Sequence, residues 1–197
     1  RLFEESYSIL LGIGDEQRTA LSLVNRGTIA MERGMYEEAR ANLEAAIVAF
    51  RRIGFGYGES LAMESLCELV ARTSDLGALG SLLDETIALS KKLENQHNLA
   101  AIAKLRGVIA ARAGDTLSAR AYGEEALAMF RDMGDRQCTI EALANLSEAA
   151  IAAGETDRAY ALVSEGLTTA NRIGYKRHVA RCLERMADVA IAWNRMD

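Results

Sequence analysis

A forty-residue period runs through the chain and constrains its fold more than any other feature. Ile13, Ile53, Leu93, Met133 and Ile173 stand forty residues apart, and no gap is needed to keep this register. Such a period is the mark of a repeat in which each unit buries its apolar face only against its neighbours. The sequence therefore predicts an array of stacked repeats.

Each period contains two helical patterns, such as those of residues 16–33 and 36–52 in the first full repeat. Proline is absent, aromatic residues make up only 6%, and alanine is abundant, which favours close-packed helices over strands. We expect full repeats at 15–54, 55–94, 95–134 and 135–174, preceded by the second helix of another repeat (1–14) and followed by the first helix of a fifth (175–197). The predicted fold is a single all-α solenoid of antiparallel helix pairs.

Residues that stop and start helices recur at the same period. The position of Gly34 recurs as Ser74, Gly114, Gly154 and Asn194. Glycine or asparagine suits a residue just past a helix in the left-handed region, so the repeat with Ser74 should turn less cleanly. Asp15, Asp115 and Asp135 precede helical patterns, where a carboxylate accepts hydrogen bonds from free backbone N–H groups.

The segment IGFGYGES, residues 53–60, raises the question of a phosphate-binding loop. It aligns with four segments that lack this character, such as IGDEQRTA (13–20) and MGDRQCTI (133–140). No strand pattern precedes it, and no Gly-Lys-Ser/Thr follows it. We interpret it as a joint between helices, which Gly56 and Gly58 make a candidate flexible point.

The bulk composition limits the kinds of partner. The net charge is −5, and Lys and Arg form no dense run of the kind that binds nucleic acid. No apolar stretch approaches the roughly 20 residues that cross a bilayer, and no signal-peptide pattern is present. Three cysteines without paired spacing suit a reducing compartment. We expect a cytoplasmic protein that binds neither membranes nor nucleic acid directly.

Side chains capable of catalysis or metal binding do not form a recognised pattern. Cys138, His178 and Cys182 share repeat positions or a helix face, but their spacing matches no standard zinc site. Cys–His catalysis would also need an oriented base and an oxyanion pocket. We therefore expect no enzyme activity, cofactor or metal, and we assign Phe50 and Phe130 to core packing.

The small and large residues within each period follow a known order. Gly27, Gly34, Tyr36, Ala39, Leu43 and Ala46 fit the spacing G-x6-G-x-Y-x2-A-x3-L-x2-A. This pattern resembles the tetratricopeptide repeat, which implies a right-handed superhelix. The period exceeds the usual 34 residues, and segments such as 119–135 resemble the long-helix variant found in MalT- and LuxR-type bacterial regulators.

The resemblance implies that the first helix of each pair lines a concave groove. The candidate partner-binding residues there are Asn25, Thr28, Glu64, Glu68, Arg72, Lys104, Arg112, Asn145, Glu148 and Arg185. Arg72, Lys104 and Arg112 either meet an acidic or phosphate group or belong to a solvated face balanced by glutamates. Asn25 and Asn145 either bond a peptide backbone or pack between helices. Val24 and Thr28 occupy positions where relatives that bind chaperone tails carry Lys and Asn, which disfavours that role.

These observations predict a non-enzymatic protein–protein interaction module. The resemblance favours the partner- or effector-sensing arm of a larger bacterial signal-transduction or transcriptional regulator, with a protein or peptide in the groove. The alternatives are a stand-alone scaffold and a peptide-pheromone receptor domain. Neither end looks like a polar cap, so we expect a fragment of a longer protein, whose uncapped ends could also associate with a second copy.

Overall fold

Helices form almost all of the protein that the structure describes. The computed structural model describes residues 9–10, 12–73 and 76–194, and within these ranges it contains no strand. The helices of this part of the chain are α2 (Glu16–Glu32), α3 (Tyr36–Ile53), α4 (Gly56–Thr73), α5 (Leu76–Lys92), α6 (Gln96–Arg112), α7 (Thr116–Asp132), α8 (Arg136–Ala152), α9 (Thr156–Ile173) and α10 (Lys176–Trp193). We call α2, α4, α6, α8 and α10 the A helices, and α3, α5, α7 and α9 the B helices.

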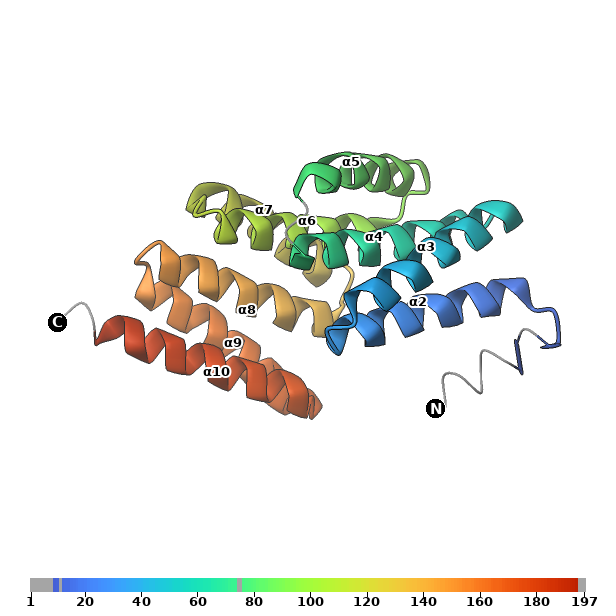
Figure 1. Ribbon diagram of the computed structural model, residues 1–197. Coiled ribbons are helices and arrows are strands. Elements are labelled where there is room, and N and C mark those ends of the chain that lie inside the picture. The colour runs from blue at the N-terminus through green and yellow to red at the C-terminus, as the bar shows by residue number, and fades with distance from the viewer. Residues whose placement is uncertain (1–8, 11, 74–75, 195–197) are drawn as a thin grey trace. The chain divides into compact units, whose positions relative to one another are not determined.

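The chain divides into two compact units, with the boundary between Leu99 and Ala100 near the start of α6. In the first unit α2 packs against α3, α3 against α4, and α4 against α5. In the second unit α7 packs against α8, α8 against α9, and α10 against both α8 and α9. Each unit is built from consecutive antiparallel helix pairs (Figure 1). The predicted all-α solenoid class is confirmed, and the segment 1–8 lies outside the described residues.

Local sequence signals set the helix ends as predicted. Asp15, Asp115 and Asp135 precede α2, α7 and α8, and each carboxylate accepts a hydrogen bond from the backbone N–H three residues later. Gly34 and its equivalents Gly114 and Gly154 have φ of 74°, 78° and 76°. The prediction is wrong for Asn194, whose φ is −64°, because there the backbone simply continues in the right-handed region. Ser74 lies outside the described residues.

The joints between B and A helices share a second glycine position. Gly14, Gly54, Gly134 and Gly174 have φ between 68° and 75°. Glu94 occupies the equivalent place with φ of 52°, and it is the one non-glycine residue with positive φ in the described part of the chain. A side chain in this region is strained, so the joint before α6 is held in place by its surroundings.

The IGFGYGES segment is a helix joint, as predicted. Gly54 ends α3 in the left-handed region, and α4 begins at Gly56. The close packing around Gly58 does not indicate the flexibility that the sequence led us to expect there. A Cβ added to Gly58 would lie 2.5 Å from the Phe50 ring and 2.6 Å from Phe55, so the missing side chain allows two aromatic rings to pack on this backbone. A Cβ on Gly56 would lie 3.1 Å from Leu93.

The core follows the small and large positions of the repeat. Phe50 and Phe130 are completely buried, which confirms their assignment to packing. A Cβ on Gly27 of α2 would come within 2.7 Å of Leu43 of α3, so this glycine allows the two helices to approach closely. Gly107 of α6 faces Gly123 of α7 in the same manner.

The second repeat replaces one aromatic core position with a polar network. Ser90 occupies the register of Phe50 and Phe130, and it is fully buried. Its hydroxyl lies 2.5 Å from Oδ1 of Asn98, and Nδ2 of Asn98 donates to the carbonyl of Ser60 at 3.0 Å. The amide of Asn95 also reaches the Ser60 hydroxyl at 3.1 Å. Hydrogen bonds therefore satisfy polar groups that would otherwise destabilise this core.

No helix among the described residues has both the length and the apolar character required to cross a bilayer.

Candidate functional site

The candidate residues of the first unit lie on α2 and α4, two A helices. Asn25 is exposed, whereas Thr28 is partly buried and donates its hydroxyl to the Val24 carbonyl at 3.1 Å. Glu68 and Arg72 form an ion pair of 2.6 Å along one face of α4, and each side chain keeps about 40% of its surface exposed. Glu64 is partly buried. The pairing of Arg72 agrees with a solvated, charge-balanced face.

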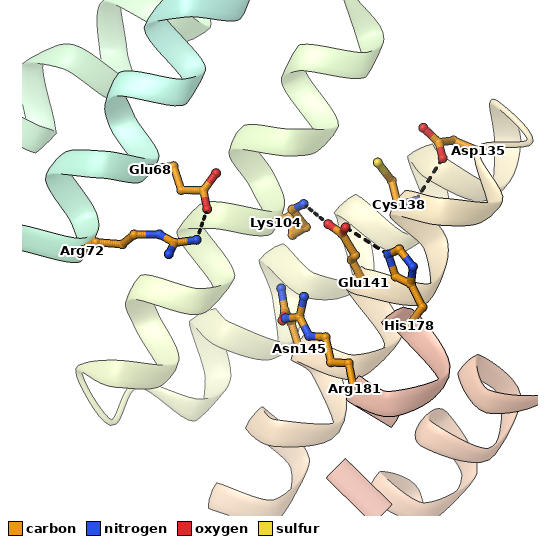
Figure 2. Close-up of polar contacts among 9 residues, drawn as sticks. All are labelled: Glu68, Arg72, Lys104, Asp135, Cys138, Glu141, Asn145, His178 and Arg181. Carbon is orange, nitrogen blue, oxygen red and sulfur yellow. Dashed lines mark hydrogen bonds and ion pairs between the residues drawn. The ribbon is translucent and has the colours of Figure 1, made fainter. Parts of the chain in front are cut away.

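In the second unit a single carboxylate joins three A helices. Nζ of Lys104 on α6 lies 2.7 Å from Oε2 of Glu141 on α8. Nε2 of His178 on α10 lies 3.3 Å from Oε1 of the same carboxylate. Figure 2 shows the side chains of Lys104 and His178 converging on Glu141. This contact ties together helices that are far apart in the sequence.

The charges around Glu141 favour its ionised form. Burial by itself would raise the pKa of the carboxyl. The positive charge and hydrogen bond of Lys104, the hydrogen bond from His178 and the charge of Arg181 outweigh burial and hold the pKa of Glu141 below its ordinary value of 4.5. The side chain is therefore a carboxylate at neutral pH, matched by cations on both neighbouring helices.

Further polar contacts extend this cluster along α8 and α10. Nη2 of Arg181 donates to Oδ1 of Asn145 at 2.7 Å (Figure 2). One turn further on, Arg185 lies 3.3 Å from both Glu148 and Asp188. We call Lys104, Glu141, Asn145, Glu148, His178, Arg181 and Arg185 the polar ladder. It contains four of the predicted binding residues: Lys104, Asn145, Glu148 and Arg185.

The contacts of the polar ladder have a common sequence separation. Lys104 to Glu141 and Glu141 to His178 are both separated by 37 residues, and Asn145 to Arg181 by 36. These values are about one helical turn shorter than the forty-residue period. Consecutive A helices in this unit are thus shifted by one turn, so a residue meets the position one turn before its own equivalent in the next repeat.

A small surface hollow lies beside the polar ladder. It is shallow, with an accessible volume of only about 10 Å³, and Lys104, Val108 and Asn145 lie around it. Gly107 and Gly123 line the hollow together with Leu146. Gly123 stands where the first repeat has Leu43, and Leu146 packs on it, since a Cβ on Gly123 would lie 2.6 Å from the Leu146 side chain. The hollow offers apolar surface next to an ammonium group and an amide.

Another charged cluster of this unit, on the B helices, is closed on itself. Arg120 contacts Glu124 and Glu155 at 3.1 and 3.4 Å, and Arg158 contacts the same two carboxylates. Hydrogen bonding from Arg158, followed by the charge of Arg120, lowers the pKa of Glu155 despite the opposing effect of burial. Because this ring lies on the B helices and not on the A helices predicted to bind a partner, it is a weaker candidate for binding than the polar ladder.

The three cysteines occupy packing positions. Cys67 and Cys182 are fully buried, as expected for small apolar side chains. Burial raises the pKa of Cys67 to about 11 and that of Cys138 to about 12, so neither thiol is an activated nucleophile. Nε2 of His178 contacts the carboxylate of Glu141. His178 thus has a partner other than Cys138 and Cys182, the two cysteines with which its position in the sequence grouped it.

Glu141 and Arg181 were not among the candidate residues predicted from the sequence. His178 attracted attention only as a possible metal ligand. The signal that could have identified the polar ladder is the spacing of about 37 residues between complementary side chains on successive A helices. The predicted basic cluster is divided between the units, since Arg72 belongs to the first and Lys104 and Arg112 to the second. Its grouping stays a prediction.

Comparisons with known proteins identify the fold and not the family. No protein-family model matches the chain, and no curated protein matches it. Among solved structures, the chain is similar to the crystal structure of BtubC (BKLC) from P. vanneervenii, with a TM-score of 0.67 and 13% sequence identity. The match covers 98% of this chain and 88% of that chain. This likeness agrees with the helical-repeat architecture, and this chain is an all-α solenoid of packed helix pairs.

Proposed function

We propose that this chain is a non-enzymatic protein–protein interaction module that holds a peptide or protein segment against its A helices. The observation that carries the proposal is the polar ladder, in which side chains of α6, α8 and α10 contact one another from helix to helix (Figure 2). Because three repeats contribute to this surface, it suits an extended segment as its ligand better than a single ion or a small group.

The chemistry of the polar ladder suits a polypeptide. The guanidinium groups of Arg181 and Arg185 have several donors each, which can bond a carboxylate or successive backbone carbonyls. Arg181 is exposed, and Arg185 is partly exposed at 29% of its side-chain surface. Asn145 adds an amide that can bond a backbone group of the ligand. Together they favour an extended polypeptide segment that carries a carboxylate.

The proposal extends to the wider role indicated by the sequence. The packing of Gly27 against Leu43 supports a tetratricopeptide-type repeat, because the small residue allows the close approach that this pattern requires. The long repeat is typical of sensor arms in MalT- and LuxR-type regulators, and we propose the same role for this chain in the cytoplasm. Partner binding across several repeats would change their curvature and signal to a neighbouring domain.

The direct test compares partner binding by matched surface variants. The chain would be immobilised as wild type, as Arg181→Glu/Arg185→Glu, and as Arg172→Glu, which changes an exposed arginine on α9. Bound proteins would be identified by mass spectrometry, and the strongest would be purified for measurement of the dissociation constant. We expect the double variant to weaken binding about a hundredfold, since each lost charged contact costs roughly 1–3 kcal/mol, and Arg172→Glu to have little effect. Equal binding by all three proteins would contradict the proposed site.

The regulator role has a separate test. An antibody against this chain would measure the mass of the native polypeptide in its source cells. A band several times larger than 21.4 kDa supports a sensor arm within a larger regulator, and a band near that mass contradicts it.

A further inference from the structure

The buried face of α5 is polar at two positions where α3 and α7 are apolar. In α3 these positions are Ala46 and Phe50, both fully buried, and α7 has the same two residue types there. In α5 they are Thr86 and Ser90, which are also fully buried. Burial of apolar surface holds a helix against its neighbour, and a phenylalanine ring supplies far more of it than a serine side chain. The C-terminal half of α5 is therefore held by less apolar burial than that of α3 or α7.

The hydroxyl groups of Thr86 and Ser90 bond within their own helix. Thr86 donates to the carbonyl of Leu82 at 2.6 Å, and Ser90 Oγ lies 2.7 Å from the carbonyl of Thr86. Such bonds persist when a helix leaves its neighbours, so they do not favour the packed state. Ser90 Oγ also lies 2.5 Å from Oδ1 of Asn98 on α6, but a serine hydroxyl has a single proton for these two acceptors. The polar core thus stabilises the packing of α5 less than an apolar core would.

The place where α4 crosses α5 carries larger side chains than the equivalent crossing of α2 and α3. Gly27 and Ala39 meet there in the first repeat, where a Cβ on Gly27 would lie 3.3 Å from the Ala39 carbonyl. The corresponding residues of the second repeat are Cys67 and Leu79. Larger side chains at a crossing hold two helix axes further apart. Cys67 meets α5 through a contact of 3.5 Å between its Sγ and Oγ1 of Thr86, and a thiol is a weak donor.

Two further contacts of α5 are exposed to solvent. Tyr57 donates its hydroxyl to the carbonyl of Leu93, just after α5, at 2.8 Å, and Arg51 of α3 lies 2.7 Å from Glu85 of α5. Water replaces exposed contacts of this kind at little cost. Glu94, in the joint that follows α5, is strained at a φ of 52°, and movement of the joint relieves this strain. The end of α5 is thus weakly held on its surface as well as in its core.

We propose that α5 is a release point of the first unit, a helix that separates from α4 in a local opening while α2 and α3 stay folded. The opening exposes the side of α4 around Cys67, which is fully buried when α5 is in place. A ligand that binds this side of α4 would shift the population toward the open state, which gives the repeat a means of conformational response. The release point does not depend on the function proposed for the polar ladder, which belongs to the second unit.

Native-state thiol labelling tests the proposal directly, because Cys67 reacts only when α5 opens. Ser147 on α8 has the register of Cys67 and is also fully buried, so Ser147→Cys, a change of one atom, is the matched reporter for a helix pair of the second unit. In α9 the positions of Thr86 and Ser90 are held by glycine and alanine, without a hydroxyl. Each rate would be measured by mass spectrometry and divided by the rate of the same thiol in the unfolded chain. We expect Cys67 to react at least about tenfold faster than the Ser147→Cys thiol.

Two variants of α5 and its joint supply an independent readout. Thr86→Val replaces the hydroxyl with a methyl group that is buried only while α5 is packed, so it should slow the labelling of Cys67 about fivefold. Glu94→Gly removes the strain of the closed joint and should slow this labelling by a similar factor. Both variants should leave the labelling of Cys182 unchanged, because Cys182 is buried in the second unit.

Equal rates at Cys67 and at the Ser147→Cys thiol would overturn the proposal. So would a rate at Cys67 that rises with guanidinium chloride as steeply as global unfolding does, because α5 would then open only together with the rest of the unit. Unchanged labelling of Cys67 in both Thr86→Val and Glu94→Gly would also contradict the proposal, because the weak contacts of α5 would then not control the opening.

Discussion

Lys104 and Glu141 link two successive A helices through an ion pair of 2.7 Å, in which each side chain keeps 23% of its surface exposed. The pair is thus more protected from solvent than most surface ion pairs, which contribute little to stability. His178 completes the site from α10. The carboxylate is therefore positioned to stabilise the stacking of repeats as well as the surface proposed to bind a partner.

Replacing Glu141 with Gln should destabilise the protein by roughly 1–2 kcal/mol at pH 7, because Lys104 loses a partly buried counter-ion. Urea unfolding followed by circular dichroism would measure the change. Glu148→Gln is the control, since Glu148 is 60% exposed and 3.3 Å from Arg185, and should cost a few tenths of a kcal/mol. A loss as small in Glu141→Gln would contradict the structural role of the pair.

The same variant should reveal a pH dependence. The pKa of Glu141 is lowered in the folded protein, so the ionised carboxylate contributes its full stability above the ordinary value of 4.5. This contribution disappears as the pH falls through the lowered folded pKa. The difference in unfolding free energy between wild type and Glu141→Gln should shrink as the pH falls below about 4.5. A difference that grows on acidification would show the opposite sign of the shift.

Gly58→Ala should destabilise the first unit by about 1–3 kcal/mol, because the new Cβ would overlap the Phe50 and Phe55 rings. Phe50 is fully buried and cannot move away easily. Thermal unfolding would measure the loss. Gly80→Ala in α5 is the matched control, since nothing lies within 4 Å of its added Cβ, and should be stabilising by up to about 1 kcal/mol. Similar gains in both variants would instead support Gly58 as a flexible point.

Glu94→Gly should stabilise the protein by about 1 kcal/mol, because a residue with a Cβ is strained at a φ of 52°. Gly134→Ala provides the reverse experiment at the equivalent joint, where φ is 68° and no atom lies within 4 Å of an added Cβ. It should cost a similar amount through backbone strain alone. Chemical denaturation would compare the two. Destabilisation by Glu94→Gly would mean that the side chain makes a contribution larger than the strain.

Asn98→Ala should destabilise the protein by about 2 kcal/mol, since it removes one partner of the buried Ser60 carbonyl and one partner of the Ser90 hydroxyl. Asn25→Ala changes an exposed asparagine on α2 and should alter stability by less than about 0.5 kcal/mol. The unfolding free energies from urea titrations would distinguish them. Equal, small effects would show that the network contributes little.

The thiols should react slowly in the native protein. Burial raises the pKa values of Cys67 and Cys138 to about 11 and about 12, so the thiolate fraction at pH 8 is very small. A chromogenic disulfide reagent should modify all three cysteines rapidly in guanidinium chloride and much more slowly without it. Rapid native labelling at Cys138, identified by mass spectrometry, would contradict the raised pKa.

Much of the fold could be read from the sequence because its signals are local. Asp15 and Gly34 act within one helix end, so their period alone predicted where α2 begins and ends. The same reasoning failed at Gly58, because a glycine also allows close packing, and the rings of Phe50 and Phe55, at the end of α3 and in the joint before α4, use this space. Asn194 likewise adopts the right-handed helical conformation, although asparagine also tolerates the left-handed one.

The candidate site was only partly predictable for a related reason. The forty-residue period placed Lys104, Asn145 and Arg185 on one face of the A helices, because residues at similar repeat positions lie on the same face of their helices. Which of them meet depends on the shift between neighbouring helices, and that shift is set by packing across the whole interface. The sequence by itself determined the helix pairs, their ends and their repeat. Only the tertiary structure decided that Glu141 joins three helices, because its contacts with Lys104 and His178 connect segments far apart in the chain.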